Sequence, residues 1–284
     1  GYDAVADDVG RLFIAQGEII LEVNESDMSL LRAQPLPQNA PSIWSLALSH
    51  DQKTLYSIAY STRETLDTFI AVSTTDFHVE ACFKLEGGIF NDKPYELPDC
   101  SKVYALGGLP NGQTVIQVIE TRNYAIVKTI IFNESGLQGI SAGPYYPFAY
   151  DSKSHTLFVG ATYVVLVIDT DRDVIKEVIH LEDAARAIGL EPWQITYFNA
   201  VSLLFHLQEN CLYIAHLDRG FMSIYNLTTN QFLPQIIPLK GYFPQFLFAN
   251  DNNSKIYCLM RRSDTVSVVD VNSKTVEKVI DLHS

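Results

Sequence analysis

The sequence predicts an all-β protein, a β-propeller of six blades with four antiparallel strands each, from three observations. An apolar–aromatic pair recurs six times along the 284 residues, with a short polar turn before each pair and an alternating strand after it. This pattern is typical of a propeller built from repeated hairpins. Seven blades remain the alternative. The whole chain, residues 1–284, is expected to form a single propeller domain.

The apolar–aromatic pairs set the length of the repeat. Their aromatic residues are separated by 43, 48, 54, 55 and 44 residues. This is the period of a four-stranded blade, with insertions in the middle of the chain. The pairs are Leu12-Phe13, Leu55-Tyr56, Val103-Tyr104, Leu157-Phe158, Leu212-Tyr213 and Ile256-Tyr257.

Polar turns and alternating strands complete each repeat. Acidic or amide side chains favour a tight reversal because they hydrogen-bond the local backbone, so we place the turn between the first and second strands there. The turns are at 7–8, 51, 99, 151, 209–210 and 251–253. Period-2 alternation predicts strands after the pairs, at 20–24, 69–73, 115–120, 164–169, 222–226 and 266–270. A further strand follows, for example at 174–181 and 276–282.

Two features depart from the repeat. Residues 182–196 break the strand pattern, and an acidic start, Ala184 and Ala185, and a stop at Gly189 predict a short helix over one face. Whether this helix is a lid or structural filler stays open. The first blade begins near Tyr2 and the last ends near Leu282, so each end of the chain is expected to complete its own blade.

The last repeat carries a family resemblance. Residues 255–257 (KIY), 266–270 (VSVVD) and 274–280 (KTVEKVI) resemble the YVTN-type repeat. The resemblance covers nearly the whole chain, with its best copies in the fourth and sixth repeats and its poorest in the third. Surface-layer propellers, propeller lactonases and the β chain of quinohaem amine dehydrogenases belong to this broad group. Because their functions differ, the resemblance implies the fold alone.

Composition limits the partners. The net charge is −13 with no stripe of Lys and Arg, so nucleic acid is not an expected partner, and no apolar stretch is long enough for membrane insertion. Four N-x-S/T patterns and a start without Met favour a secreted, periplasmic or extracellular protein, with the cytoplasm as the alternative. The four cysteines fit no metal spacing, and a Cys82–Cys100 pair is left open. No cofactor is expected, and the oligomeric state is not indicated.

The expected site is the face formed by the loops between blades and those between second and third strands, because several blades converge there. Large aromatic residues of these loops would wall a ligand pocket or wedge between blades. They are Trp44, Tyr95, Tyr146, Trp193, Tyr197 and Phe243. The charged candidates are Arg63, Glu64, His216, Asp218, Arg219 and Arg261.

Three functions are compatible with this face. The first is a non-catalytic recognition or ligand-binding propeller, since the chain has no Walker, HExxH or dinucleotide motif. The second is a lactonase-like or alkaloid-synthase-like enzyme. In it, His216, Asp218 or Glu64 would act as acid–base groups, and an arginine would hold an anion. The third is a propeller subunit of a redox assembly whose cofactor belongs to another chain, because no CxxCH haem motif is present.

Overall fold

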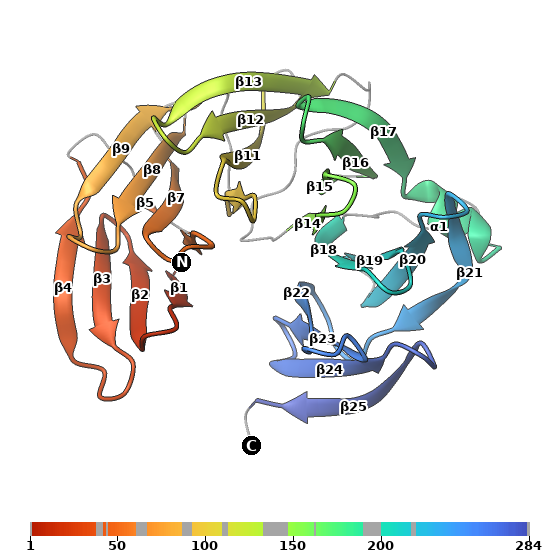
Figure 1. Ribbon diagram of the computed structural model, residues 1–284. Coiled ribbons are helices and arrows are strands. Elements are labelled where there is room, and N and C mark those ends of the chain that lie inside the picture. The colour runs from red at the N-terminus through yellow and green to blue at the C-terminus, as the bar shows by residue number, and fades with distance from the viewer. Residues whose placement is uncertain are drawn as a thin grey trace. The chain divides into compact units, whose positions relative to one another are not determined.

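The structure is a computed structural model of the chain (Figure 1). It describes residues 2–37, 42–43, 45–60, 67–86, 93–109, 113–132, 147–161, 163–189, 200–216 and 220–282. The chain divides into two compact units, which comprise residues 1–144 and residues 145–284. Each unit is described by itself.

The first unit holds three antiparallel sheets, each built from consecutive strands. The first sheet comprises β1 (Tyr2–Ala6), β2 (Arg11–Gln16), β3 (Ile19–Asn24) and β4 (Leu30–Pro35). In the second sheet, β5 (Ser42–Ile43) and β6 (Ala47–Leu48) both pair with β7 (Thr54–Tyr60), followed by β8 (Thr68–Ser73) and β9 (Val79–Lys84). The third comprises β10 (Tyr95–Glu96), β11 (Lys102–Gly108), β12 (Thr114–Glu120) and β13 (Ala125–Phe132).

The second unit holds three more sheets of the same order. The fourth sheet comprises β14 (Phe148–Asp151), β15 (Thr156–Ala161), β16 (Val164–Asp169) and β17 (Val174–His180), and α1 (Glu182–Ala187) follows it. The fifth comprises β18 (Ala200–His206), β19 (Cys211–His216), β20 (Phe221–Asn226) and β21 (Gln231–Pro238). The sixth comprises β22 (Pro244–Ala249), β23 (Lys255–Met260), β24 (Thr265–Asp270) and β25 (Thr275–Asp281).

These elements confirm the predicted all-β fold, and the described residues form six antiparallel sheets. The six alternating strands predicted from the sequence coincide with β3, β8, β12, β16, β20 and β24 to within one residue at each end. Both terminal sheets consist of consecutive strands, as expected, so neither borrows a strand from the other end of the chain. The predicted helix is present as α1 and is followed by Gly189, which has φ of +76°.

One backbone hydrogen bond recurs at the equivalent position of all six sheets. In every sheet, a backbone N–H just after the third strand donates to a carbonyl in the turn before the second strand, at 2.8 to 3.1 Å. The donors are Glu25, Thr74, Thr121, Thr170, Leu227 and Val271, and their acceptors are Gly10, Lys53, Ser101, His155, Asn210 and Ser254. The same two turns therefore meet in all six sheets.

A left-handed residue ends the same hairpin in every sheet. Three positions after each of those donors the backbone has φ between 53° and 57°. The residues are Met28, Phe77, Tyr124, Asp173, Asn230 and Lys274. None is a glycine, and two are Asp173 and Asn230, which tolerate this region. At the other four positions the side chain disfavours it, so the hairpin geometry there is imposed by the repeat rather than by local preference.

Burial explains why the strand signals differ along each repeat. Inner strands such as β8 and β16 are covered on both faces and read as nearly continuous apolar runs. Outer strands such as β4 and β9 alternate between exposed and half-buried residues. The aromatics of the recurring pairs are at most 2% exposed in the first five sheets. Four of them, Phe13, Tyr56, Phe158 and Tyr213, belong to apolar clusters that combine residues of neighbouring sheets of one unit.

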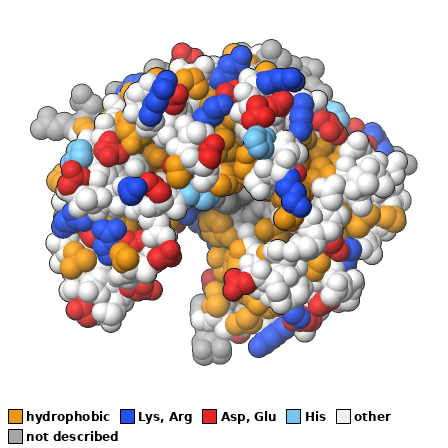
Figure 2. Space-filling model, viewed as in Figure 1, with side chains coloured by type: hydrophobic (Ala, Val, Ile, Leu, Met, Phe, Trp, Pro, Cys, Tyr) orange, Lys and Arg blue, Asp and Glu red, His pale blue; other side chains and the backbone are white. Residues whose placement is uncertain are grey.

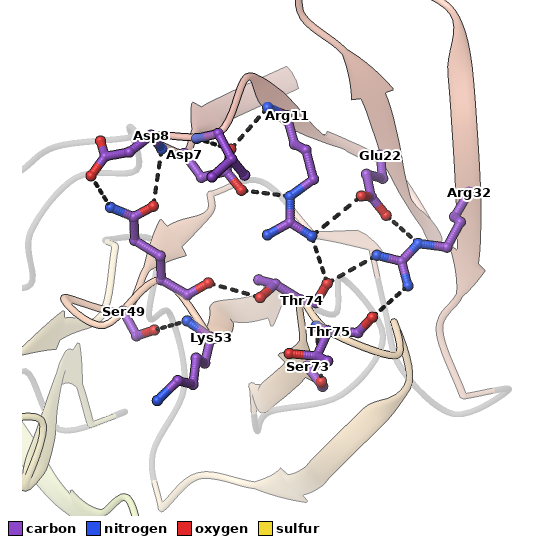
Figure 3. A network of polar contacts seen from close by, with 12 residues as sticks. Asp7, Asp8, Arg11, Glu22, Arg32, Ser49, Lys53, Ser73, Thr74 and Thr75 are labelled. Atoms are coloured by element: carbon purple, nitrogen blue, oxygen red, sulfur yellow. Dashed lines mark hydrogen bonds and ion pairs between the residues drawn. The ribbon is translucent and has the colours of Figure 1, made fainter.

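A network of ion pairs within the first sheet is connected by hydrogen bonds to the second sheet (Figure 3). Glu22 on β3 is only 2% exposed and accepts from the guanidinium groups of Arg11 and Arg32. Arg11 also donates to Asp7 at 2.6 Å. Both arginines reach across to the turn after β8, where they donate to the Thr74 carbonyl at 2.9 Å each. The buried carboxylate therefore positions two cations that hold the neighbouring sheet.

The cysteines do not form the pair that the sequence left open. Cys82 lies on β9 with its side chain exposed, and Cys100 lies in the turn before β11. Both are free thiols, as are Cys211 and Cys258. Burial raises the pKa of all four thiols, so none is poised as a thiolate.

Candidate functional site

Four of the predicted site residues lie in the described part of the chain: His216, Tyr95, Phe243 and Arg261. The others lie outside the described residues, namely Trp44, Arg63, Glu64, Tyr146, Trp193, Tyr197, Asp218 and Arg219. Two of the four described residues, Phe243 and Arg261, are brought into contact.

Phe243 and Arg261 belong to two loops that lie against each other. Residues 240–243 connect the fifth and sixth sheets, and residues 261–264 connect β23 and β24; we call them the paired loops. The backbone N–H of Arg261 donates to the Phe243 carbonyl at 2.9 Å. The N–H of Tyr242 donates to Ser263 Oγ at 2.8 Å. The sequence predicted that these two classes of loop share a face, and within this sheet they do.

Close backbone approach keeps the paired loops together. A side chain at Gly241 would place its Cβ 2.8 Å from Ser263 Oγ and 3.0 Å from the Cβ of Met260, and its φ is +149°. Gly220, at the start of β20, would meet the Gly241 carbonyl oxygen at 2.6 Å. Glycine is therefore required at both positions. The close approach to Gly241 ties Gly220 of the fifth sheet to this site. The Gly220 carbonyl also accepts the N–H of Leu239, the residue before the paired loops, at 2.7 Å.

The paired loops are rich in cations and expose an aromatic side chain. The guanidinium of Arg262 lies 3.9 Å from the centre of the Phe243 ring, a cation–π contact. Tyr242 is 70% exposed. Lys240, Arg261 and Arg262 form no ion pair with any residue that the structure describes, whereas Asp264 supplies one negative charge in the same turn.

This local excess of cations contrasts with the rest of the chain. The protein carries 33 acidic and 20 basic residues. Over the face drawn in Figure 2, acidic and basic side chains are interspersed. Elsewhere in the same unit, described cations such as Lys255, Lys274 and Arg186 contact carboxylates at 3.0 Å or closer. The paired loops are thus a positively charged feature of an acidic protein.

His216 lies inside the fifth sheet rather than in a loop. It is the last residue of β19, pairs with both Ala200 and Phe221, and is 0% exposed. Its Nε2 lies 2.7 Å from Ser223 Oγ, and its ring is 4.7 Å from that of Phe221. Burial lowers the pKa of His216 to about 3. The ring is therefore neutral at physiological pH and enclosed by protein.

Tyr95 lies at the start of the third sheet, on β10, and is half-buried. Two residues before it, the Lys93 ammonium contacts Asp3 at 2.7 Å. The same carboxylate accepts the Leu46 N–H at 2.8 Å. Asp3 on β1 therefore links segments of all three sheets in the first unit, and Tyr95 is placed next to this junction.

A polar cluster that sequence reasoning missed joins the fifth and sixth sheets. Glu209 accepts hydrogen bonds from the Tyr213 hydroxyl at 2.6 Å and from Lys274 Nζ at 2.7 Å. Burial raises the pKa of Glu209, but these two donors outweigh it and leave the pKa below the ordinary value. His206 is buried nearby, with Nε2 2.7 Å from the Asn253 carbonyl oxygen. The sequence separation of Glu209 and Lys274 hid this contact.

A groove in the second unit was also not predicted. It lies between β17, α1 and β21 and has a volume of about 560 Å³. Its lining combines apolar side chains with charged and amide groups: Val178, Ile179, His180, Asp183, Arg186, Ala187, Tyr225, Asn230, Gln231, Phe232 and Pro234. The predicted helix was its only sequence signal.

Metal and membrane features were also searched in the described residues. Within the ranges given above, no group of three or more His, Cys, Asp or Glu side chains is arranged to hold a metal ion. None of the described helical residues forms a span with the length and hydrophobicity needed to cross a membrane.

Comparison with known proteins supports the fold. No family model and no curated protein matches the sequence. Among solved structures, the chain is similar to hydrazine synthase of Kuenenia stuttgartiensis, with a TM-score of 0.72 and 12% sequence identity. The match covers 95% of this chain and 83% of that chain. Together with the six antiparallel sheets, this likeness supports a β-propeller fold, and at this identity it carries the fold alone.

Proposed function

We propose that this propeller is a non-catalytic recognition module that binds a carboxylate-bearing partner at the paired loops. The observation that carries the proposal is the contact between Phe243 and Arg261, which joins two loops around an exposed tyrosine and cations without carboxylate partners. Tyrosine and arginine, together with tryptophan, are enriched among the residues that dominate binding energy.

Preorganisation favours anion binding at this place. The Arg262 guanidinium is held over the Phe243 ring, so less side-chain entropy is lost when an anion binds it. Arginine binds carboxylates through paired N–H groups and needs no proton transfer to do so. Lys240 adds a further positive charge, and the single carboxylate of Asp264 does not neutralise the group.

The enzymatic alternative has less support in the described residues. Its histidine, His216, is buried and neutral and lies against Ser223 and Phe221, so a substrate in the loops would not reach it. A general base needs a pKa near the operating pH and hydrogen-bond access to the reacting proton. Asp218 and Glu64 lie outside the described residues and stay candidates for that alternative. The redox-subunit alternative would require a partner that brings the cofactor.

The proposal is tested by binding of an acetylated, amidated peptide of three glutamates and a tryptophan to the full chain. Isothermal titration calorimetry would measure its dissociation constant, with a peptide of three glutamines and a tryptophan as the uncharged probe. We expect Arg262→Met to weaken binding of the glutamate peptide about tenfold, because a charge-assisted contact of about 1.4 kcal/mol is lost.

The matched control removes the same charge elsewhere. Arg172 lies in the turn after β16 with its side chain 80% exposed, and Arg172→Met should change affinity less than about twofold. Equal losses in both variants would mean that net charge alone attracts the peptide. Equal affinity for the glutamate and glutamine peptides would also contradict the proposal. Succinate serves as the small-molecule arm, and tight binding of succinate alone would indicate a free dicarboxylate ligand.

A further inference from the structure

The groove between β17, α1 and β21 is a second surface of the same unit and shares no residue with the paired loops. The helix that walls it is an insertion into the repeat: it follows the outer strand of the fourth sheet, and it is the one α-helix among the residues that the structure describes. Ala184 and Ala185 of α1 are buried in the core together with Phe232. The insertion is thus anchored to both sheets that it bridges.

The floor of the groove is apolar. Ile179, Tyr225 and Phe232 line the groove and are 3%, 6% and 8% exposed. The two aromatic rings pack edge to face, with centroids 5.0 Å apart and an interplanar angle of 72°. Pro234 and Ala187 contribute apolar walls. Such a floor suits an unbranched alkyl chain, which loses contact with water when it lies along it.

The rim of the groove is acidic. Arg186 is shared between Asp183 at 2.5 Å and Glu182 at 3.0 Å, so one cation faces two carboxylates. Glu177 accepts the Tyr225 hydroxyl at 3.3 Å, and no described cation lies within ion-pair distance of it. His180 also lines the groove. Asp183 lines the groove, whereas Glu182 and Glu177 lie next to it and contact its lining residues Arg186 and Tyr225. Three carboxylates and one arginine in and beside the groove give its rim a net negative charge that repels anions.

The repeat itself does not require this carboxylate. The outer strand of the fourth sheet reads VIKEVIH at residues 174–180, and that of the sixth reads TVEKVID at residues 275–281. When the two strands are aligned residue by residue, Lys278 of the sixth sheet occupies the position that Glu177 occupies in the fourth. This position of the outer strand therefore accepts a positive or a negative side chain. The fold of the repeat alone does not explain why a carboxylate, Glu177, stands beside the groove.

We propose that the groove binds the side chain of a lysine or arginine in an exposed segment of a partner protein. The alkyl stem lies over Tyr225 and Phe232, and the cationic end reaches the rim at Glu177. Amide side chains of Asn230 and Gln231 stand at the edge, where they can hydrogen-bond the backbone of the segment. The net charge of −13 attracts basic segments to this protein.

The test uses the full chain and three tripeptides, acetyl-Gly-X-Gly-amide, with X as lysine, norleucine or glutamate. Titration followed by NMR gives dissociation constants, and the methyl signals of Ala187 and Val178 report whether the groove is occupied. We expect the lysine peptide to shift these signals and to bind at least about fivefold more tightly than the norleucine peptide. Glu177→Gln should remove that difference while the protein stays folded.

Asp251→Asn is the matched control, because Asp251 is an exposed carboxylate in the turn after β22 and does not line the groove. It should leave the preference for lysine intact. The proposal would be overturned if the lysine and norleucine peptides bound equally well or if the shifted signals lay outside the groove. It would also be overturned if no binding were seen at 10 mM peptide, which is about the weakest affinity that a recognition site would need. Butylamine that binds as tightly as the lysine peptide would overturn the assignment to a protein partner. Arg262→Met should not affect this binding, so failure here is separable from failure at the paired loops.

Discussion

The guanidinium of Arg262 lies 3.9 Å from the centre of the Phe243 ring, and this contact joins the loop before β22 to the turn after β23. The two loops are also joined by a backbone hydrogen bond, which the Arg261 N–H donates to the Phe243 carbonyl. The positive charge is therefore held at a fixed place in the paired loops. This arrangement is the basis of the recognition function proposed above.

Substitution of Gly241 tests the geometry of the paired loops. Gly241→Ala should lower the free energy of unfolding by about 1–3 kcal/mol, because the new Cβ meets Met260 and Ser263 and the φ of +149° is strained. Urea denaturation measures the loss. The variant should also bind the glutamate peptide more weakly. A variant as stable as the wild type would show that the loops approach each other less closely than described.

Glu22 tests the network between the first two sheets. Glu22→Gln should destabilise the chain by about 1–3 kcal/mol, because Arg11 and Arg32 lose the buried carboxylate that positions them. Arg172→Gln removes one partner of an exposed pair at 3.8 Å and should cost less than about 0.5 kcal/mol. Amide exchange in the turn at 73–76 should accelerate in Glu22→Gln alone. Similar effects of the two substitutions would contradict a structural role for the network.

Asp7 makes stability depend on pH. Burial raises the pKa of its carboxyl, but hydrogen bonds from the backbone and side chain of Arg11 outweigh burial and hold the pKa below 3.8. A carboxyl with a depressed folded-state pKa stabilises the protein above its unfolded pKa, and that stability is lost as the pH falls through the folded value. We expect Asp7→Asn to reduce the difference in unfolding free energy between pH 7 and pH 2.5. An unchanged difference would exclude Asp7 as a contributor.

The left-handed residue of the first sheet should be improvable. Met28 has φ of 57° and is 61% exposed, and the equivalent residue of the fifth sheet is Asn230. Met28→Asn should raise the free energy of unfolding by about 0.5–1 kcal/mol, because asparagine tolerates this region better. Met28→Ala keeps the strain and serves as the control. If alanine stabilises as much as asparagine, the effect does not come from the backbone conformation.

His216 should remain neutral over the physiological range. Its pKa of about 3 comes from burial, so its Cε1 proton signal should not titrate between pH 8 and pH 4.5. Because the unfolded state takes up a proton below its ordinary pKa and the folded state does not, His216 lowers stability as the pH falls toward 3. A midpoint near pH 6.5 in the NMR titration would contradict the enclosed position.

The sequence predicted the strands well because their signal is local. Alternation at 164–169 coincides with β16, and the acidic start before Ala184 predicted α1. The hydrogen bond of Arg32 with the Thr74 carbonyl and the ion pair of Lys274 with Glu209 span 42 and 65 residues, and no local pattern encodes them. The assignment of Phe243 to a loop between blades and of Arg261 to a loop between second and third strands did predict that these two residues share a face.

His216 shows where the same reasoning fails. The sequence placed it in the loop after a short strand, but β19 extends through it, because both neighbours, β18 and β20, continue to pair at that position. Strand ends depend on the partners across the sheet, and these come from segments that are separated in sequence. The groove was missed for the same reason: the sequence predicted α1, but no local pattern predicted its contact with β21.

The most direct test of the central claim is an NMR spectrum of the arginine side-chain Nε–H groups in the full chain, recorded while the glutamate peptide is added. The account predicts that the signals of Arg261 and Arg262 shift with the dissociation constant of the peptide, while that of Arg172 does not. Shifts confined to other arginines, or no shift at a peptide concentration that saturates binding, would contradict recognition at the paired loops.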